Sequence, residues 1–205
     1  NITDLPHFRT VPYNPLSPTN PAFAPQIPVL NGTFAPLNQA FDFLGMPERK
    51  IIFSETAASA VVIHDESLPN ISAQLTQVLV GGGLDVPTAT ILGMQFGQSR
   101  QATRNDLLVL PASSVIATLN QQYFAQLVAM GVPQATAGQL AINGITYPLR
   151  DKWVLLPSEQ ADIVAATTAF NAVIKQAADE KGLAFVDANL LLKQLAINGL
   201  RFGNY

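Results

Sequence analysis

The sequence predicts a protein of the α/β class, and three segments near its end lead to this expectation. Residues 158–181 carry apolar side chains at helical spacing, residues 183–186 are a short apolar run typical of a strand, and residues 190–196 are again helical. Tight links join the three, which is typical of an open α/β sheet. Because one strand cannot form a sheet, its parallel neighbours must come from earlier in the chain or from sequence outside it.

The N-terminal part of the chain is rich in proline. Residues 1–47 hold nine of the fifteen prolines and only three charged residues, which predicts a long extended arm laid over a surface. Pro36 is expected to open a short helix over Leu37–Leu44, ended by Gly45. Residues 1–6 lack the basic region and apolar run of a signal peptide, so we do not expect one there.

The middle of the chain predicts short strands alternating with helices. Two apolar runs, Lys50–Phe53 and Ala60–Ile63, indicate two strands in a loose hairpin. Residues 70–80 have helical spacing and stop at the three glycines that follow. Further expected elements are a strand at Leu107–Leu110, a helix from Ser113 or Ser114 to Met130 with Gly131 at its end, and a type I′ turn at Asn143-Gly144.

Composition excludes several classes of function. Of the 205 residues 48% are apolar, and the charged share of 12% is about half the roughly 25% of ordinary domains. A net charge of −3 without a basic cluster argues against nucleic-acid binding. With no Cys and two His, we expect no disulfide, thiolate nucleophile, metal site or cofactor. No apolar run is long enough for a transmembrane helix.

One long stretch of the chain is uncharged. No charged residue occurs from Leu107 to Leu149, whereas a free-standing lobe normally carries charge on its solvent face. One hypothesis is that part of this region faces an apolar partner, an acyl substrate or the missing remainder of a domain. The alternative is a secreted protein of low charge, kept soluble by Gln, Asn, Ser and Thr.

Sequence motifs for catalysis are weak. Neither a nucleotide-binding loop nor a G-x-S-x-G nucleophile turn occurs. His64-Asp65-Glu66-Ser67 gathers polar groups after a strand, but residues adjacent in sequence cannot reach triad geometry, which favours a solvated turn. Asp4-Leu5-Pro6-His7 has a spacing that lets a carboxylate orient an imidazole, so His7 is either a general base or a loop histidine.

Several short sequence segments, taken in their order along the chain, resemble a known family. They are Ile2–Pro6 with Thr10–Asn14, Arg100–Thr103 with Asp106–Pro111, Asp151–Leu155 with Pro157–Gln160 and Thr168–Asn171, and Lys181–Asn189. In this order they resemble the SGNH/GDSL-type hydrolases of Bacteroidetes-like bacteria, which are exported proteins often carried as lipoproteins. The resemblance spans nearly the whole chain and matches the interior to C-terminal portion of such an enzyme.

The resemblance implies a flavodoxin-like three-layer α/β/α fold and ester hydrolysis by a Ser nucleophile, a His base and an oxyanion hole. Residues 1–150 would be a Pro-rich arm plus a low-charge insertion lobe of mixed α+β structure. Residues 151–205 would be the last core helix, the edge strand and the start of the final helix. A small-molecule acyl or sugar ester would be the substrate. The protein would be secreted, periplasmic or anchored in the outer membrane.

The family's catalytic residues do not carry over to this chain. No G-D-S occurs, Asn105-Asp106 lacks the preceding Gly of the G-x-N-D motif, and the D-x-x-H spacing of residues 4–7 lies at the wrong end. We therefore assign no catalytic residue. Residues 1–10 would lie at the carboxyl edge of the sheet, where open α/β folds bind ligands, so His7 and Phe8 are expected to line the pocket.

A second hypothesis is a non-catalytic binding or interaction module that uses the low-charge surface. It is motivated by the Pro-rich arm, the uncharged stretch and the missing motifs. An unpaired edge strand at residues 183–186 would also favour a homodimer or pairing with the missing part of the domain.

Overall fold

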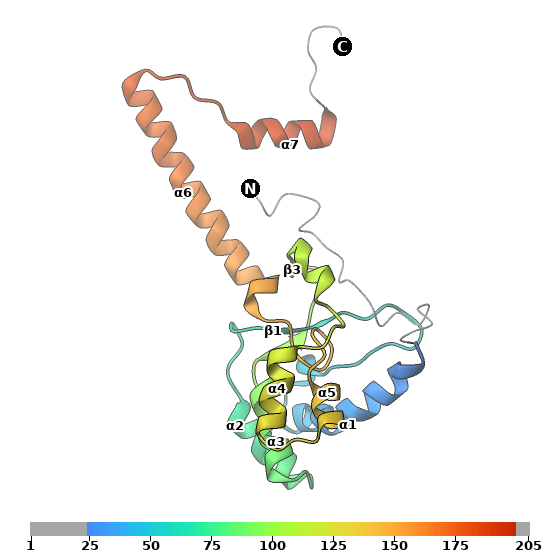
Figure 1. The fold of residues 1–205 in the computed structure, drawn as a ribbon. Coiled ribbons are helices and arrows are strands. Elements are labelled where there is room, and N and C mark those ends of the chain that lie inside the picture. Colours follow the sequence, from blue (N-terminus) through green and yellow to red (C-terminus); the bar gives the residue numbers. More distant parts are fainter. Residues whose placement is uncertain (1–23, 200–205) are drawn as a thin grey trace. The chain divides into compact units, whose positions relative to one another are not determined.

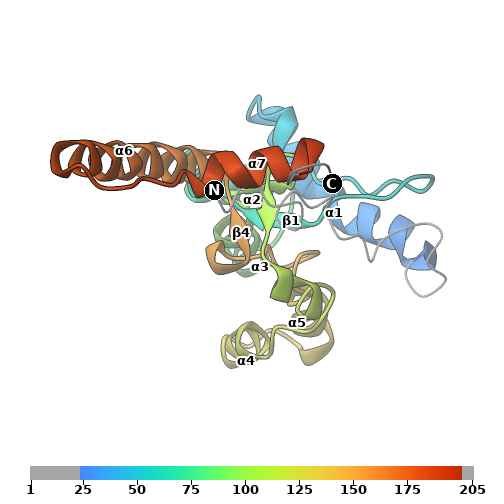
Figure 2. The ribbon, with the colours of Figure 1, turned by 90° about the horizontal axis from the view of Figure 1, so that it is seen from above.

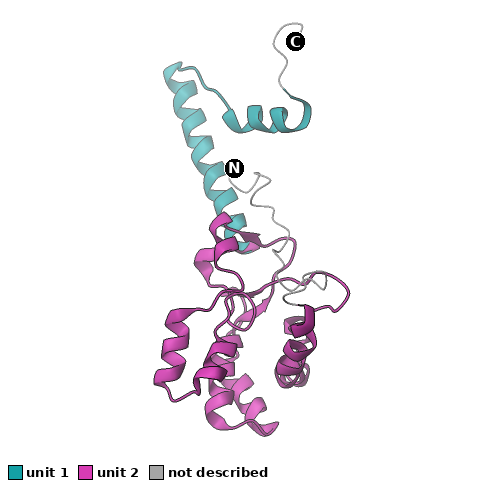
Figure 3. Cartoon of the chain, turned by 45° about the vertical axis from the view of Figure 1, so that its right-hand side comes forward, with its two compact units in different colours: residues 1–5, 158–205 teal, residues 6–157 magenta. Residues whose placement is uncertain are grey.

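The structure is a computed structural model that describes residues 24–199, and the chain divides into two compact units. One unit is residues 6–157 and the other is residues 1–5 with 158–205 (Figure 3). We call the described part of the first unit the lobe (residues 24–157) and that of the second the helical pair (residues 158–199). The described chain combines helices with small antiparallel sheets, which is compatible with the α/β class in its general sense (Figure 1).

The lobe contains two sheets of two strands each. In the first, β1 (Val62–His64) pairs antiparallel with β2 (Ser99–Gln101), and Ile63 lies opposite Arg100. In the second, β3 (Leu107–Leu108) pairs antiparallel with β4 (Val154–Leu155). The central residue of β1 is fully buried, so this strand runs through the core of the lobe.

The other elements of the lobe are helical. They are η3 (Ala24–Gln26), α1 (Ile27–Phe43), η4 (Pro47–Arg49), α2 (Ser72–Gly81), α3 (Val86–Phe96), η5 (Leu110–Ser114), α4 (Gln121–Ala129), α5 (Gln134–Leu140) and η6 (Asp151–Trp153). The helix predicted over residues 70–80 is confirmed as α2. One apolar core joins α1, α2 and α3, and a second lies around the two sheets.

Helix α1 begins well before its predicted start at Leu37, and Pro36 lies inside it. An interior proline removes one backbone hydrogen bond and costs about 3 kcal/mol. The helix nevertheless buries Phe34, Leu37 and Phe41, each 3% exposed or less. Burying such a side chain contributes about 1.5–3 kcal/mol. The expectation that Pro36 opens the helix was therefore wrong, because the packing of the helix outweighs the local cost of an interior proline.

The predicted strand at Lys50–Phe53 is not in a sheet, and its predicted hairpin with the following run is wrong. Two side-chain amides of α1 hold this extended segment instead. Asn38 accepts from the backbone N–H of Ile51 and donates to its carbonyl, both at 2.8 Å. Asn31 makes the same pair of bonds with Phe53, at 2.8 and 2.9 Å. The amide groups of a helix thus replace a neighbouring strand.

The helix predicted from Ser113 or Ser114 begins later, at Gln121. The chain between them bonds to a distant loop, since Ala117 N–H donates to the carbonyl of Asn143 and Asn120 N–H to that of Ala141. The Asn120 side chain then caps α4 by accepting from the N–H of Tyr123. The predicted end of this helix is confirmed, with Gly131 in the left-handed region at φ 88°.

Two further predictions of the middle region hold only in part. The strand expected over residues 107–110 is limited to β3, and Leu110 already belongs to η5. Gly144 has the positive φ expected of a turn, 73°. The turn does not join two strands, however, because Gly144 N–H bonds to the carbonyl of Tyr147 within the same loop.

Helices α2 and α3 approach each other closely. Gly93 on α3 and Gly97, which directly follows that helix, lie one turn apart and face the backbone of Ser72 on α2. A Cβ at Gly93 would lie 2.7 Å from the Ser72 carbonyl oxygen, a separation that side chains do not tolerate. The absence of a side chain at both positions permits this packing.

A buried cation closes the end of α3. Arg49, which is 2% exposed, donates to the carbonyls of Gly97 at 2.8 Å and Pro69 at 3.3 Å. Burial lowers the pKa of its guanidinium, whereas Glu48 and Asp65 raise it. A positive charge at a helix C-terminus is electrostatically favourable, so Arg49 links η4 to the carboxyl end of α3.

The helical pair consists of two helices. The long helix α6 (Pro157–Lys181) is uninterrupted, and Gly182 follows it at φ 62° (Figures 1 and 2). Helix α7 (Ala188–Asn198) confirms the second predicted helix and is capped by the side chain of Asp187. Residues 183–186, which the sequence predicts to be a strand, belong to no sheet among the described residues, and these residues offer them no neighbouring strand. None of the helices in residues 24–199 is long and apolar enough to span a membrane.

Candidate binding pocket beside helices α3 and α4

The residues that the sequence predicts to line a pocket lie outside the described residues. This holds for His7 and Phe8, and equally for Asp4 in the D-x-x-H spacing. The described part of the lobe holds a cluster of buried charges around Arg100, and cavities of which the one beside α3 and α4 has a charged residue in its lining.

The expected solvated turn at residues 64–67 is wrong for Asp65, which is 2% exposed. Its carboxylate accepts from Arg100 Nε at 2.6 Å and from the N–H and hydroxyl of Ser67. The Ser67 hydroxyl thus bonds directly to a carboxylate. The imidazole of His64 does not bridge these two groups, and burial and Arg150 lower its pKa. These residues do not form a catalytic triad.

Asp106 completes the cluster. Arg100 donates to both of its carboxylate oxygens, at 2.7 and 2.8 Å, and the N–H and hydroxyl of Thr103 donate to one of them. Burial raises the pKa of Asp106. The hydrogen bonds from Arg100 and Thr103, together with the positive charge of Arg100, outweigh the effect of burial and hold that pKa below its usual range. Asp106, which the family resemblance compares with the Asp of the G-x-N-D motif, is therefore bound within the fold by Arg100 and Thr103.

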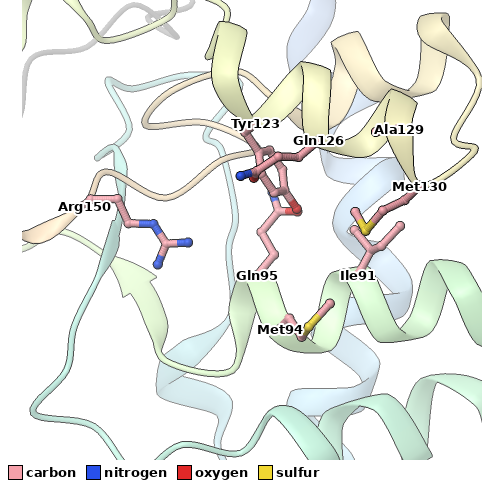
Figure 4. A pocket seen from close by; sticks show the side chains of 8 residues that line it. All are labelled: Ile91, Met94, Gln95, Tyr123, Gln126, Ala129, Met130 and Arg150. Atoms are coloured by element: carbon pink, nitrogen blue, oxygen red, sulfur yellow. The ribbon is translucent and has the colours of Figure 1, made fainter.

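A cavity of about 480 Å³ lies between α3 and α4. Its lining residues are Ile91, Met94, Gln95, Tyr123, Gln126, Ala129, Met130 and Arg150 (Figure 4). Three of these residues belong to α3 and three to α4. Met130 caps the carboxyl end of α4, and Arg150 directly precedes η6. The volume falls within the range of about 300–1,000 Å³ that is usual for small-molecule sites.

Two polar side chains in the middle of the cavity, Gln95 and Tyr123, bond to each other. The Tyr123 hydroxyl donates to Gln95 Oε1 at 2.8 Å, and Gln95 Nε2 donates to the carbonyls of Leu140 and Thr146. Burial is the main cause that raises the pKa of Tyr123 to about 12, so the phenol stays protonated at neutral pH. The Tyr147 ring packs against Tyr123 with 4.4 Å between ring centroids. These contacts hold Gln95 and Tyr123 in place, and the middle of the cavity carries no charged side chain.

Arg150 is the charged residue of the lining. Its Nε donates to the Tyr147 hydroxyl at 3.0 Å, and its guanidinium lies over that ring, 5.1 Å from the centroid. Within residues 24–199 no carboxylate lies at ion-pair distance from it. The stacking fixes the plane of the guanidinium and leaves its terminal nitrogens for an anion.

Sequence reasoning missed these lining residues because no motif connects them. One signal was present, since Arg150 is the first charged residue after the uncharged stretch from Leu107 to Leu149. Within the lobe, no three His, Asp or Glu side chains come close enough together to hold a metal ion. Comparison of the chain with protein-family models, curated proteins and solved structures finds no match.

Proposed function

We propose that this chain is a portion of a serine ester hydrolase of the SGNH/GDSL type that acts on acyl or sugar esters. In this proposal residues 151–205 belong to a flavodoxin-like α/β/α core, and residues 1–150 form an insertion that shapes the substrate pocket. The ordered set of phrases from Ile2 to Asn189 supports the family. An exported location, secreted, periplasmic or anchored in the outer membrane, belongs to the same proposal.

The observation that carries the proposal is the uncovered apolar surface of the helical pair. The side chains concerned are Val164, Phe170, Val173, Ile174, Leu183, Phe185, Val186, Leu190, Leu191, Leu192, Leu195 and Ile197, each at least 40% exposed. The residue buried within α6 is Ala178, and α7 has none. Soluble proteins rarely expose so many large apolar side chains together. A larger core that covers them would explain this surface.

The pattern also fits a particular place in such a core. A continuous apolar run such as residues 183–186 is typical of a parallel strand buried on both faces. Here the run links α6 and α7 and belongs to neither helix, and in an α/β protein a strand of the sheet stands between two helices in the same way. In the proposed enzyme it would pair with a strand from the rest of the core.

Catalysis would need groups from the remainder of the protein. Ser67 bonds directly to Asp65 and His64 does not stand between them, so this serine is not paired with a base in the triad manner. Without a nucleophile and base, nearly all covalent catalysis is lost. The chain by itself is therefore expected to be inactive.

A fluorophosphonate probe with intact-mass detection tests the proposal. The probe is applied to this chain and to a longer protein from the same reading frame extended on both sides. We expect one adduct on the longer protein, at the Ser of a G-D-S motif upstream, and none on this chain. An extended frame without that motif, or an adduct on the 205-residue chain, would overturn the assignment.

The uncovered surface also favours a second candidate, a non-catalytic interaction module that forms a homodimer. Two copies could bury the same apolar residues against each other through a symmetric interface. Sedimentation velocity distinguishes the two proposals on this chain. A dimer that Phe170→Ser with Ile174→Ser dissociates supports the module, and a monomer at all concentrations eliminates it.

A further inference from the structure

The cavity beside α3 and α4 differs chemically at its two ends. Figure 4 shows Arg150 at one end, with its guanidinium turned toward the cavity, and Ile91, Met94 and Met130 at the other. The two methionines are exposed, at 60% and 57%. An amphipathic occupant with one anionic group would match both ends.

The middle of the cavity narrows the choice of occupant. Gln95 and Tyr123 are bonded to each other, and the Gln95 amide is also bonded to two backbone carbonyls. A ligand that places polar groups against Gln95 and Tyr123 would have to compete with these bonds, and polar atoms left without partners would cost affinity. An alkyl chain makes no such demand. It gains from leaving water for a surface of Ile and Met side chains.

The positive charge of Arg150, at one end of the cavity, selects an anion. Arg150 is held by Tyr147 through its Nε, so its two terminal nitrogens can make the paired hydrogen bonds that suit a carboxylate. No other charged side chain lines the cavity. Methionine is flexible and polarisable, and adapts to alkyl chains of different shape.

We propose that this cavity binds the anion of a medium-chain fatty acid, with the carboxylate on Arg150 and the alkyl chain against Met94 and Met130. The inference rests on the cavity and not on the proposed hydrolase activity, because the binding is measured on this chain without catalysis. It also gives the uncharged stretch from Leu107 to Leu149 a role, since α4 supplies one wall of the site.

Methyl NMR of the 205-residue chain labelled at the methionine methyl groups tests the proposal. The chain has three methionines, and Met46 packs against the α1–α2–α3 core, away from the lining. Octanoate should shift the signals of Met94 and Met130 saturably and leave Met46 unchanged. Acetate should shift none of them, because it lacks the chain.

Neutral analogues and variants test the anionic end. Octanol and methyl octanoate should bind more weakly than octanoate, and Arg150→Gln should weaken octanoate binding about tenfold without changing octanol binding. Arg104→Gln is the matched control, because Arg104 is an exposed arginine outside the lining. Ala129→Leu narrows the cavity and should weaken octanoate and octanol alike.

Several results would overturn the inference. One is a parallel shift of all three methionines, which would indicate non-specific association. A second is equal affinity for octanoate and octanol, or an Arg150→Gln variant that binds octanoate as the native chain does. Unchanged signals at Met94 and Met130 up to the solubility limit of octanoate would also exclude the site. A failed fluorophosphonate test on the longer protein leaves each of these readouts intact.

Discussion

The close approach of α2 and α3 gives a prediction whose sign comes directly from the structure. In Gly93→Ala, the new Cβ would lie 2.7 Å from the Ser72 carbonyl oxygen and would also meet the hydroxyl of Thr76. The carbonyl belongs to the backbone of α2, so it cannot rotate away as a side-chain end could. The two helices must therefore separate, and the Thr76 hydroxyl must also move, which disturbs its 2.8 Å bond to the Ser72 carbonyl.

The expected magnitude combines two opposing effects. Overpacking costs about 1–3 kcal/mol, and replacing glycine by alanine inside a helix returns about 0.5–1 kcal/mol. With the disturbed Thr76 bond included, we expect Gly93→Ala to lower the free energy of unfolding by about 2 kcal/mol. Gly138→Ala on α5 is the matched control, since no atom lies within 4 Å of its Cβ position. It should raise stability by about 0.5–1 kcal/mol.

Urea unfolding followed by the fluorescence of Trp153 measures both variants, because this is the chain's one tryptophan and it lies in the lobe. Opposite shifts of the midpoint at unchanged slope confirm the packing. If Gly93→Ala is as stable as the native chain, or if both variants shift alike, then α2 and α3 do not pack as closely as described here.

Three further predictions concern buried polar groups. Arg100→Met leaves two carboxylates buried without their cation and should lower the free energy of unfolding by about 3–5 kcal/mol. Lys175→Met removes one partner of an exposed ion pair and should change that free energy by under about 0.5 kcal/mol. Chemical denaturation of both variants measures the difference. Because the folded pKa of Asp106 lies below its unfolded value, its contribution is complete above about pH 4 and lost as pH falls through the folded pKa. Denaturation at several acidic pH values should show this loss in the native chain and not in Asp106→Asn. Asn38→Ala removes both bonds to an extended backbone segment and should cost about 1–3 kcal/mol, while Gln39→Ala should be neutral; equal melting temperatures would refute this role.

Helix positions could be predicted where local signals and packing agree. The apolar spacing before the three glycines gave α2, and Gly131 and Gly182 ended their helices as expected because their left-handed φ suits glycine. Proline misled at Pro36, since its local preference is worth less than the burial of the helix face around it. Serine misled at the start of α4, where long-range backbone bonds to the 141–143 loop delay the helix.

The buried charges could not be predicted from neighbouring residues. Asp65 stands between two polar residues in a stretch that resembles a surface turn, and Asp106 follows an exposed loop. What buries them is Arg100, far from Asp65 in sequence, which β2 places beside the end of β1. Only the strand pairing creates this proximity, so no local pattern contains it.

Residues 183–186 show that an apolar sequence pattern predicts burial but does not by itself predict strand pairing. Four apolar residues in a row predict burial on both faces, and this is a statement about surroundings. A strand further requires a partner for its backbone groups, and the described chain provides none. The burial that the pattern predicts is absent as well, because Leu183 and Val186 are exposed at 65% and 71%. A surface that still requires burial is what the proposed α/β core and the proposed dimer have in common. A measurement of what covers these side chains therefore decides between them more directly than a search for catalytic residues in this chain.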